Sequence, residues 1–452
     1  MRINRPVHRD PVYTHAGGAG EVLTHEQTLT RMVLACMLWE PSFYKKDGTE
    51  TANEIRQLVA KCKPAFVAQL AIEARHKHNM RHVSLLLVRE LARHPQLHDG
   101  RTLTGLLPMT LTSVISRADE LAEFLSIYWM DGKCPISHGV RKGLRNAFQK
   151  FNAYQFAKYD RDAAIKLRDV MFLCRPRPDT PEREALYKCI ADRTLETPET
   201  WEVLLSSGAD KRETFTRLIS ERKLGMLAML RNLRNMVNAG VSTEVIREGL
   251  RTASGAERVL PFRYIAAAVA CPMLENDIDA CMLAQPVDPE SILLGKTVLI
   301  VDVSGSMYQT MSQKSQMNLA DAASALACIL RERCADLDTY TFSDRVIGVP
   351  PRRGMALRDA IHQSQEHRNT YLATAINTVR EAYHPLRNPV ARTIVITDEQ
   401  SHDGIALPMG KGYLLNVGAY SNAVRTAGQW ERISGLSEAS VSYIAALEKE
   451  GL

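Results

Sequence analysis

The stretch Lys296-Thr297-Val298-Leu299-Ile300-Val301-Asp302-Val303-Ser304-Gly305-Ser306-Met307 decides the fold of the last third of this chain. Its first half is an apolar, mostly β-branched run, which predicts a buried strand of a parallel sheet. Asp302, Ser304 and Ser306 follow at alternate positions, so one carboxylate and two hydroxyls share the turn after the strand. Open α/β sheets bind their ligands at the carboxyl ends of their strands. Because Mg²⁺ and similar cations prefer oxygen ligands, we predict a divalent metal site in this turn.

Predicted strands and helices alternate through the rest of the C-terminal region, after Pro286 and Pro289. The expected strands cover residues 298–303, 337–342, 393–398 and 413–417, and the expected helices cover residues 318–333, 372–382, 424–433 and 440–448. Such alternation predicts a doubly wound α/β sheet with parallel strands. We assign residues 291–452 to this domain.

Two further oxygen donors are expected at the same edge of the predicted sheet. Asp398 ends its own predicted strand, and Thr370 lies in the loop before the helix at 372–382. With the first turn they provide two carboxylates and three hydroxyls, a set that leaves room for water or for an acidic group of a partner. Three alternatives stay open. The serines cap the next helix and bind no metal, Thr370 is a helix N-cap, or Thr374 replaces Thr370 as the ligand.

Residues 1–290 are predicted to be helical throughout, without a strand. Thr24 with Gln27, and Thr51 with Glu54, have the spacing of capping boxes that begin helices. Lys63-Pro64 places a proline at the first position of another helix. Many helices joined by short polar links, with no exact repeat, predict an all-α array of the HEAT type.

The positive charge of the chain is concentrated in one segment. Residues 291–452 contain 16 basic and 16 acidic residues, whereas residues 131–180 contain 11 basic and 5 acidic residues. This segment therefore accounts for the whole net charge of +6. A local excess of cations is typical of a surface that binds a phosphate backbone.

A helix expected over residues 138–151 concentrates this charge on one face. Val140, Leu144 and Phe148 fall on one side, and Arg141, Lys142 and Arg145 fall on the other with no acidic residue between them. An ordinary solvated helix face is the alternative. Further cations and two tyrosines follow, a combination that suits RNA phosphates and unpaired bases. The predicted RNA-contacting residues are His138, Arg141, Lys142, Arg145, Lys150, Lys158, Arg161, Arg168 and Arg175.

Cysteine usage and hydropathy favour a cytoplasmic protein. The nine cysteines are scattered without a CxxC pair, which suits a reducing compartment better than a disulfide framework. No apolar run is long enough to cross a bilayer, and the N-terminal residues lack the apolar core of a signal peptide.

These motifs resemble two known modules. Asp302-x-Ser304-x-Ser306, Thr370 and Asp398 resemble the metal-ion-dependent adhesion site (MIDAS) of von Willebrand factor A domains. The helical part is similar to the TROVE module of the Ro autoantigen family of ring-shaped RNA-binding proteins. This second likeness rests on Ala16-Gly17-Gly18, Gly143-Leu144-Arg145-Asn146-Ala147, Lys158-Tyr159, Leu167-Arg168-Asp169-Val170, Met229-Leu230-Arg231-Asn232-Leu233 and Pro261-Phe262-Arg263-Tyr264. One departure is the loop Glu366-His367-Arg368-Asn369 before Thr370, where the family often has glycines.

The resemblance implies a TROVE-like ring of helical repeats over residues 1–290, closed by the A domain of residues 291–452. It further implies a monomeric ribonucleoprotein that binds Y-like noncoding RNA on an outer basic surface. The single-stranded 3′ ends of misfolded RNAs would pass through the central hole. Bacterial members of the family can tether an exoribonuclease in RNA quality control. The implied cofactor is a divalent cation, the Mg²⁺ of the adhesion site.

Two other classes of function compete with this interpretation. In the first, the protein is a metal-dependent adhesion scaffold that recruits partners through the A domain, and its helical half is only a support. The second is a hydrolase, which the sequence supports little, because no Gly-x-Ser-x-Gly elbow frames Ser304 or Ser306. We therefore expect an RNA-binding scaffold without catalysis of its own.

Overall fold

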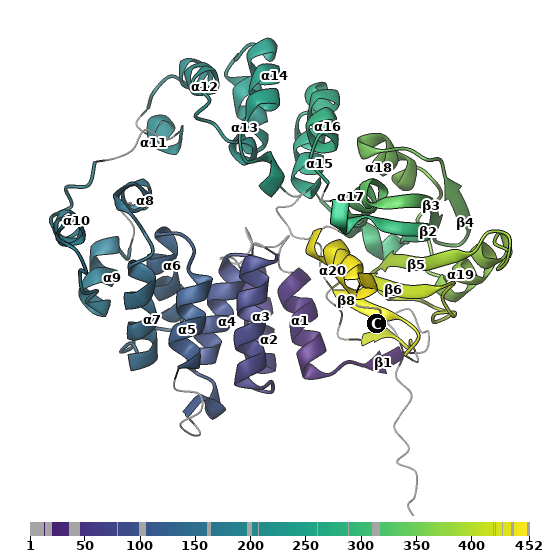
Figure 1. Cartoon of the computed structure of the whole chain (residues 1–452), viewed down its shortest axis with the longest axis horizontal. Helices are drawn as coiled ribbons and strands as arrows, with labels where there is room; N and C mark the ends of the chain where they lie inside the picture. Colours follow the sequence, from purple (N-terminus) through teal and green to yellow (C-terminus); the bar gives the residue numbers. More distant parts are fainter. Residues whose placement is uncertain are drawn as a thin grey trace, which may run out of the picture. The chain divides into compact units, whose positions relative to one another are not determined.

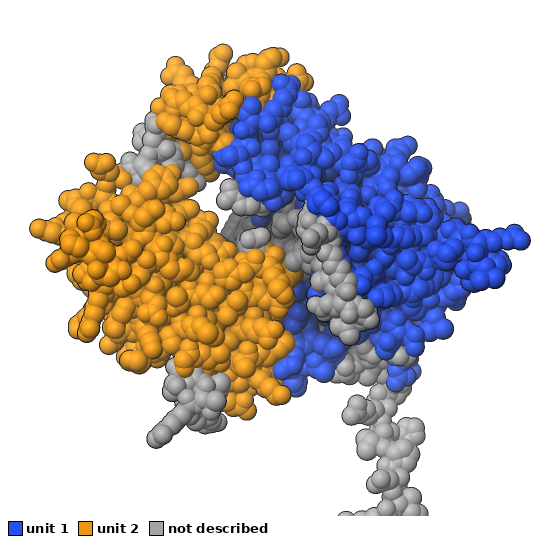
Figure 2. Space-filling view, in the orientation of Figure 1, with its two compact units in different colours: residues 1–35, 225–234, 250–452 blue, residues 36–224, 235–249 orange. Residues whose placement is uncertain are grey.

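The computed structural model describes residues 13, 20–35, 46–78, 80–98, 105–160, 164–196, 201–206, 208–259, 261–287, 289–309, 317–418, 420, 422–426, 428–434 and 438–449. Helices dominate the first part of the chain, and a sheet with helices around it forms the last part (Figure 1). The chain divides into two compact units (Figure 2). The helical unit contains residues 36–224 and 235–249, and the sheet-containing unit contains residues 1–35, 225–234 and 250–452.

The helical unit is an array of short helices that pack on their neighbours. Its helices are α2 (Lys46–Val59), α3 (Pro64–His76), α4 (His82–Ala92), α5 (Leu106–Val114), α6 (Asp119–Tyr128), α7 (His138–Phe148), α8 (Ala153–Tyr159), α9 (Leu167–Cys174), α10 (Pro181–Asp192), α11 (Trp201–Ser206) and α12 (Lys211–Ser220), with a 3-10 turn at Pro95–His98. α3 packs on α4 and α5, α5 packs on α7, and α7 packs on α9. The expected HEAT-like helical region is confirmed; its closure into a ring stays a prediction.

Two helices, α13 (Met226–Asn238) and α14 (Thr243–Thr252), contribute residues to both units. α1 (His25–Ala35), α15 (Pro261–Ala270) and α16 (Glu275–Leu283) belong to the sheet-containing unit, with 3-10 turns at Ala256–Arg258, Pro272–Leu274 and Pro289–Ser291. α16 ends at Leu283 and β2, the first strand of the large sheet, begins at Leu293, so the predicted border of residues 290 and 291 lies between them. The compact units divide elsewhere, because α15 packs on α17 (Leu319–Arg333) and α16 packs on α18 (Gly354–His362).

The sheet has six strands in the order β4-β3-β2-β5-β6-β8. They are β2 (Leu293–Asp302), β3 (Cys334–Phe342), β4 (Val346–Val349), β5 (Val390–Thr397), β6 (Lys411–Asn416) and β8 (Glu431–Ser434). All pair in parallel except β4, an antiparallel edge strand. α19 (Leu372–Glu381) and α20 (Glu438–Lys449) complete the unit with a 3-10 turn at Gly305–Tyr308. The predicted α/β fold is confirmed.

The central strand β2 is buried over its last six residues, as its apolar run predicts for a strand covered on both faces. Val298 and Ile300 pack with Phe342 of β3, Val395 of β5 and Ile376 of α19 in one apolar cluster. This packing fixes the carboxyl end of β2, where Asp302 lies, in the interior of the unit.

Three details of the predicted secondary structure are wrong. β1 (Gly20–Val22) pairs with β7 (Asn422–Val424), although no strand was expected before residue 290. In place of the helix expected over residues 424–433, β7 ends at Val424 and β8 begins at Glu431, where its pairing with β6 outweighs local helix propensity. α2 begins at Lys46, so Thr51 and Glu54 lie inside it and do not form its cap. The capping box of Thr24 and Gln27 is present in both directions.

Candidate metal centre and nucleic-acid interface

The two candidate metal-binding carboxylates come from neighbouring parallel strands. β2 and β5 pair in register up to Val301 and Ile396, so Asp302 and Asp398 follow at the same edge of the sheet. Both are fully buried. Oδ1 of Asp302 accepts from the Ser304 N–H at 2.9 Å, and Oδ2 accepts from the Thr397 hydroxyl at 2.6 Å. These bonds fix the orientation of the Asp302 carboxylate.

The loop that carries Thr370 is bonded to the turn after β2. The Gly305 N–H donates to the Arg368 carbonyl at 3.0 Å, and the His367 Nδ1 lies 2.9 Å from the Val303 carbonyl oxygen. A Cβ at Gly305 would lie 3.3 Å from the His367 carbonyl oxygen, so glycine favours the close approach of the two loops. The loop of residues 366–369 therefore approaches the turn after β2 without the glycines that the family often has at these positions, and His367 makes one of the contacts between the two loops.

Thr370 and Thr374, the two candidate threonine ligands, have different surroundings. Thr370 is buried, and its main chain pairs with His402 through the Thr370 carbonyl and the His402 N–H at 2.8 Å. The hydroxyl of Thr374 donates to Oδ2 of Asp403 at 2.7 Å and therefore belongs to the cap of α19. The N-cap position of α19 is Tyr371, so Thr370 is not its cap.

The electrostatics of this centre favour a bound cation. Burial, and then repulsion by Asp398, raises the pKa of Asp302 to about 7. Burial also raises the pKa of Asp398, whose buried Oδ2 has no hydrogen-bond partner among the described residues. The hydroxyls of Ser304 and Ser306 lie 3.3 Å apart at the same turn. A divalent cation would offset the repulsion and satisfy the orphaned oxygen.

The five predicted ligands, Asp302, Ser304, Ser306, Thr370 and Asp398, thus come from three loops that are tied to one another. Among the described residues, no three side chains of the His, Cys, Asp and Glu types gather into a metal-binding group. Hydroxyl oxygens would therefore have to complete any cation site at this edge, a composition that suits a hard cation such as Mg²⁺.

The predicted basic helix is α7, and its packing directs the charged face outward. Ser137 caps it by accepting from the Val140 N–H at 3.3 Å. A Cβ at Gly143 would lie 2.9 Å from Cβ of Leu111, so the glycine allows α5 to approach closely. Arg141 and Lys142 are exposed on the opposite side. The wheel drawn from the sequence therefore gives the correct buried face.

Two of the predicted RNA-contacting residues have structural partners. Arg145 is half-buried, and its Nε donates to the Cys174 carbonyl at 3.1 Å, which joins α7 to the end of α9. The Lys150 ammonium donates to the carbonyls of Thr112, at 2.8 Å, and Ile115 at the end of α5. Burial lowers the pKa of Lys150. Lys150 therefore acts as a C-terminal cap of α5, a role for which lysine is well suited.

The remaining predicted cations lie on or after α7, α8 and α9. His138 is exposed at the start of α7, and Arg175 is exposed where α9 ends in a left-handed residue with φ 51°. Lys158 lies 5.6 Å from the ring centre of Tyr159, and Arg168 lies 5.6 Å from that of Phe172. Arg161 and the segment 16–18 lie outside the described residues.

We define the basic surface as His138, Arg141, Lys142, Arg145, Arg168 and Arg175. Three of the described acidic residues in the segment 131–180 have partners outside the basic surface. Asp169 caps α9 by accepting from the Lys166 N–H at 2.9 Å, and Asp179 pairs with Arg183. Asp131 pairs with Arg56, Arg89 and Arg93. In the part of the chain that the structure describes, no acidic side chain forms an ion pair with the basic surface.

Phe172 is a surface residue that the sequence reasoning missed. It is 53 % exposed on α9, while Leu167, Val170, Met171 and Cys174 form the buried side of that helix. A helical wheel of residues 167–174 would have placed Phe172 away from the apolar stripe, so the signal was present in the sequence.

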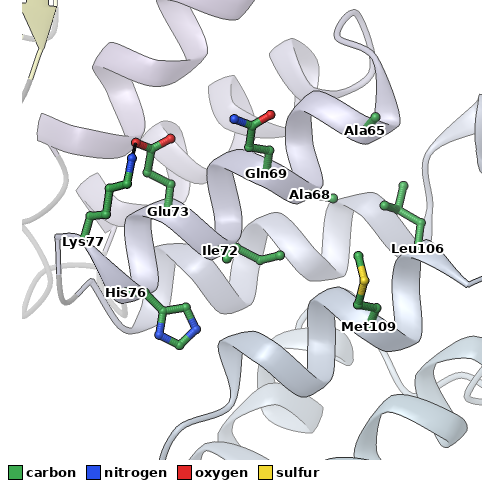
Figure 3. Close-up of a pocket in the computed structure, with 9 residues that line it drawn as sticks. All are labelled: Ala65, Ala68, Gln69, Ile72, Glu73, His76, Lys77, Leu106 and Met109. Atoms are coloured by element: carbon green, nitrogen blue, oxygen red, sulfur yellow. Dashed lines mark hydrogen bonds and ion pairs between the residues drawn. The ribbon is translucent and has the colours of Figure 1, made fainter. Parts of the chain in front are cut away.

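An apolar groove of about 370 Å³ lies between α3 and α5 (Figure 3). Ala65, Ala68, Ile72, Leu106 and Met109 line it, and Gln69, Glu73, His76 and Lys77 supply its polar groups. Lys77 is paired with Glu73 at 2.6 Å, and the His76 Nε2 lies 3.1 Å from the Ser113 carbonyl oxygen. The groove therefore has no cluster of cations to match that of the basic surface.

Comparison with known families supports both predicted modules. A TROVE domain model matches residues 190–326, and a von Willebrand factor type A domain model matches residues 297–400. This chain combines a TROVE domain with a von Willebrand factor type A domain. The TROVE match begins after α9, so the basic surface lies outside the matched residues.

Individual relatives agree with this assignment. The chain is 33 % identical over 111 residues to the mouse telomerase protein component 1 and 32 % identical over 111 residues to the rat protein. Each match covers 24 % of this chain and only 4 % of the relative. The crystal structure of the Deinococcus radiodurans Ro (RSR) protein aligns with a TM-score of 0.59 and 18 % identity. This alignment covers 95 % of this chain and 100 % of that chain, so the predicted Ro-like fold is confirmed.

No helix within the described residues has the length and apolar character needed to span a membrane.

Proposed function

We propose that this protein binds RNA through the basic surface of α7 and α9. The observation that carries the proposal is a set of arginines and lysines on two packed helices, without acidic partners among the described residues. Cations of this kind attract a polyanion and release its counterions on binding. Compared with this surface, the apolar groove between α3 and α5 offers little for a phosphate backbone.

The RNA partners that we propose are Y-like noncoding RNA and the single-stranded ends of misfolded RNA. The protein would act as a scaffold in RNA quality control or RNA stability, in the cytoplasm, without catalysis of its own. An exoribonuclease or another RNA-processing protein is the proposed protein partner. The Ro-like fold supports this proposal, and the basic surface supplies the chemistry that it requires.

Binding of labelled RNA to the full chain, followed by fluorescence anisotropy, tests the proposal. The double variant Arg141→Ala/Lys142→Ala should weaken binding, because both side chains are exposed and available to phosphates. Lys61→Ala/Lys63→Ala is the matched control, since it removes two exposed cations near the start of α3. Equal affinities for the two double variants would contradict the proposed surface. Crosslinking in the native host and sequencing of the bound RNA would identify the RNA.

We also propose that Asp302, Ser304, Ser306, Thr370 and Asp398 hold a divalent cation, Mg²⁺ in the simplest case. The orphaned Oδ2 of Asp398 and the mutual repulsion of the two buried carboxylates support this proposal. The cation would keep an open position for an acidic group of a protein partner, as an adhesion module requires. This docking function is compatible with RNA binding, because the two sets of residues are separate.

Isothermal titration with Mg²⁺ or Mn²⁺ tests the metal proposal. Asp302→Asn keeps the size of the side chain and removes its charge, and it should abolish binding. Asp336→Asn is the control, because Asp336 is an exposed partner of Lys296 near the amino end of β3, away from the carboxyl edge. Unchanged binding in Asp302→Asn, or equal loss in both variants, would contradict the assignment.

A further inference from the structure

We infer that Phe172 is a stacking platform on which the basic surface holds an unpaired RNA base. This inference rests on the proposed RNA binding and adds a specific contact to it. The ring is 53 % exposed although it belongs to a helix whose other apolar side chains are largely buried. Exposed aromatic rings within cationic surfaces are the usual stacking sites for single-stranded nucleic acid.

Two cations flank Phe172 in the sequence of α9, each about one helical turn away from it. Arg168 lies one helical turn before Phe172, with its guanidinium 5.6 Å from the ring centre. Arg175 follows at the end of α9 and is exposed. Residues three and four apart on a helix share one face. The guanidinium of Arg168 therefore lies beside the Phe172 ring, and more than half of the Phe172 side chain stays exposed.

The platform is held in place by contacts that do not involve the ring. Arg145 of α7 donates to the Cys174 carbonyl at the end of α9, at 3.1 Å. Asp169 caps the start of the helix, and Val170 and Met171 anchor it in the core. A preorganised ring loses little conformational entropy when a base stacks on it, which favours affinity.

Charge decides between RNA and an apolar protein segment as the occupant. A hydrophobic segment would cover Phe172 but would leave the guanidinium groups of Arg145, Arg168 and Arg175 without counterions. A single-stranded RNA supplies a planar base for the ring and phosphates for the arginines. The occupant that satisfies both is therefore an RNA segment with unpaired bases.

The test compares Phe172→Ala, Phe172→Leu and Phe172→Trp in the full chain, with a single-stranded RNA oligonucleotide and its abasic counterpart. For the normal RNA, Phe172→Ala should weaken binding about 5- to 150-fold, the usual range for one stacked base. Phe172→Trp should restore binding and Phe172→Leu should not, because stacking needs an aromatic ring. The abasic RNA should bind the wild type and Phe172→Ala alike.

Met109→Ala is the matched control, since Met109 is 57 % exposed on α5 in the same unit but lies in the apolar groove. Equal losses for normal and abasic RNA, or restoration by Phe172→Leu, would overturn stacking and indicate a general apolar contact. An unchanged RNA affinity in Phe172→Ala would overturn the stacking site. The proposed function would still stand in that case if RNA binding depended on Arg141 and Lys142. A wild type without RNA affinity would overturn both.

Discussion

The salt dependence of RNA affinity should change in a defined way when Arg141 and Lys142 are both replaced by alanine. These two side chains are exposed, whereas Arg145 also donates a hydrogen bond that joins α7 to α9. Replacing Arg145 as well would confuse RNA contact with packing, so the double variant is the cleaner perturbation. Surface substitutions of this kind change stability by no more than about 0.5 kcal/mol.

The expected magnitude follows from the number of cations on the basic surface. Arg141, Lys142, Arg145, Arg168 and Arg175 would contact about five phosphates, and each contact adds about 0.7 to the slope of log K against log salt for a single strand. The wild type should therefore show a slope of about −3.5 and the double variant a slope of about −2. Between about 50 and 200 mM salt, affinity should fall roughly 100-fold for the wild type and roughly 20-fold for the variant.

Fluorescence anisotropy with a labelled single-stranded RNA, repeated across this range of salt, gives both slopes. Lys61→Ala/Lys63→Ala should keep the wild-type slope, because these lysines lie outside the basic surface. A flat salt response in the wild type would refute the electrostatic basis of the proposal. An identical slope in wild type and Arg141→Ala/Lys142→Ala would show that the phosphates bind elsewhere.

Three further predictions concern the metal centre and stability. Asp302→Ala should abolish divalent-cation binding in calorimetry and leave RNA affinity unchanged; loss of both would mean that the α/β region helps to form the RNA surface. Arg31→Ala should lower the free energy of unfolding by about 1.5–3 kcal/mol in urea denaturation, because it removes one of the two arginines paired with the buried carboxylate of Glu399 and leaves Arg432. Lys77→Ala, at an exposed pair, should cost about 1 kcal/mol or less. Burial lowers the pKa of His78 from 6.5 to about 4, so the unfolded state takes up a proton first as pH falls. Unfolding free energy should therefore drop between pH 6.5 and 4 by up to about 3 kcal/mol, and His78→Gln should remove that drop; an equal pH dependence in the variant would contradict the assignment.

The site of the proposed metal could be predicted from the sequence because it depends on strand ends. The apolar runs before Asp302 and Asp398 identify buried parallel strands, and parallel strands end at a common edge. The buried face of α7 was likewise evident from its periodicity. In each case the signal is local to a few consecutive residues.

Features that depend on distant partners could not be predicted. The strands β1 and β7 have only three residues each and are defined by their pairing with each other. Glu399 adopts a left-handed φ of 62°, rare for a residue with a side chain, and contacts Arg31, Asn416 and Arg432. The role of Lys150 as a cap of α5 depends on how α5 and α7 pack. None of these contacts leaves a pattern in the neighbouring sequence.

Ultraviolet crosslinking of the full chain to a photoreactive single-stranded RNA, with mass spectrometry of the crosslinked peptides, tests the central claim most directly. If the basic surface binds RNA, crosslinked nucleotides should map to peptides from residues 138–177, including the peptide that contains Phe172. Arg141→Ala/Lys142→Ala should reduce these crosslinks. Crosslinks confined to residues 291–452, or crosslinks within 138–177 that persist unchanged in the variant, would contradict the account.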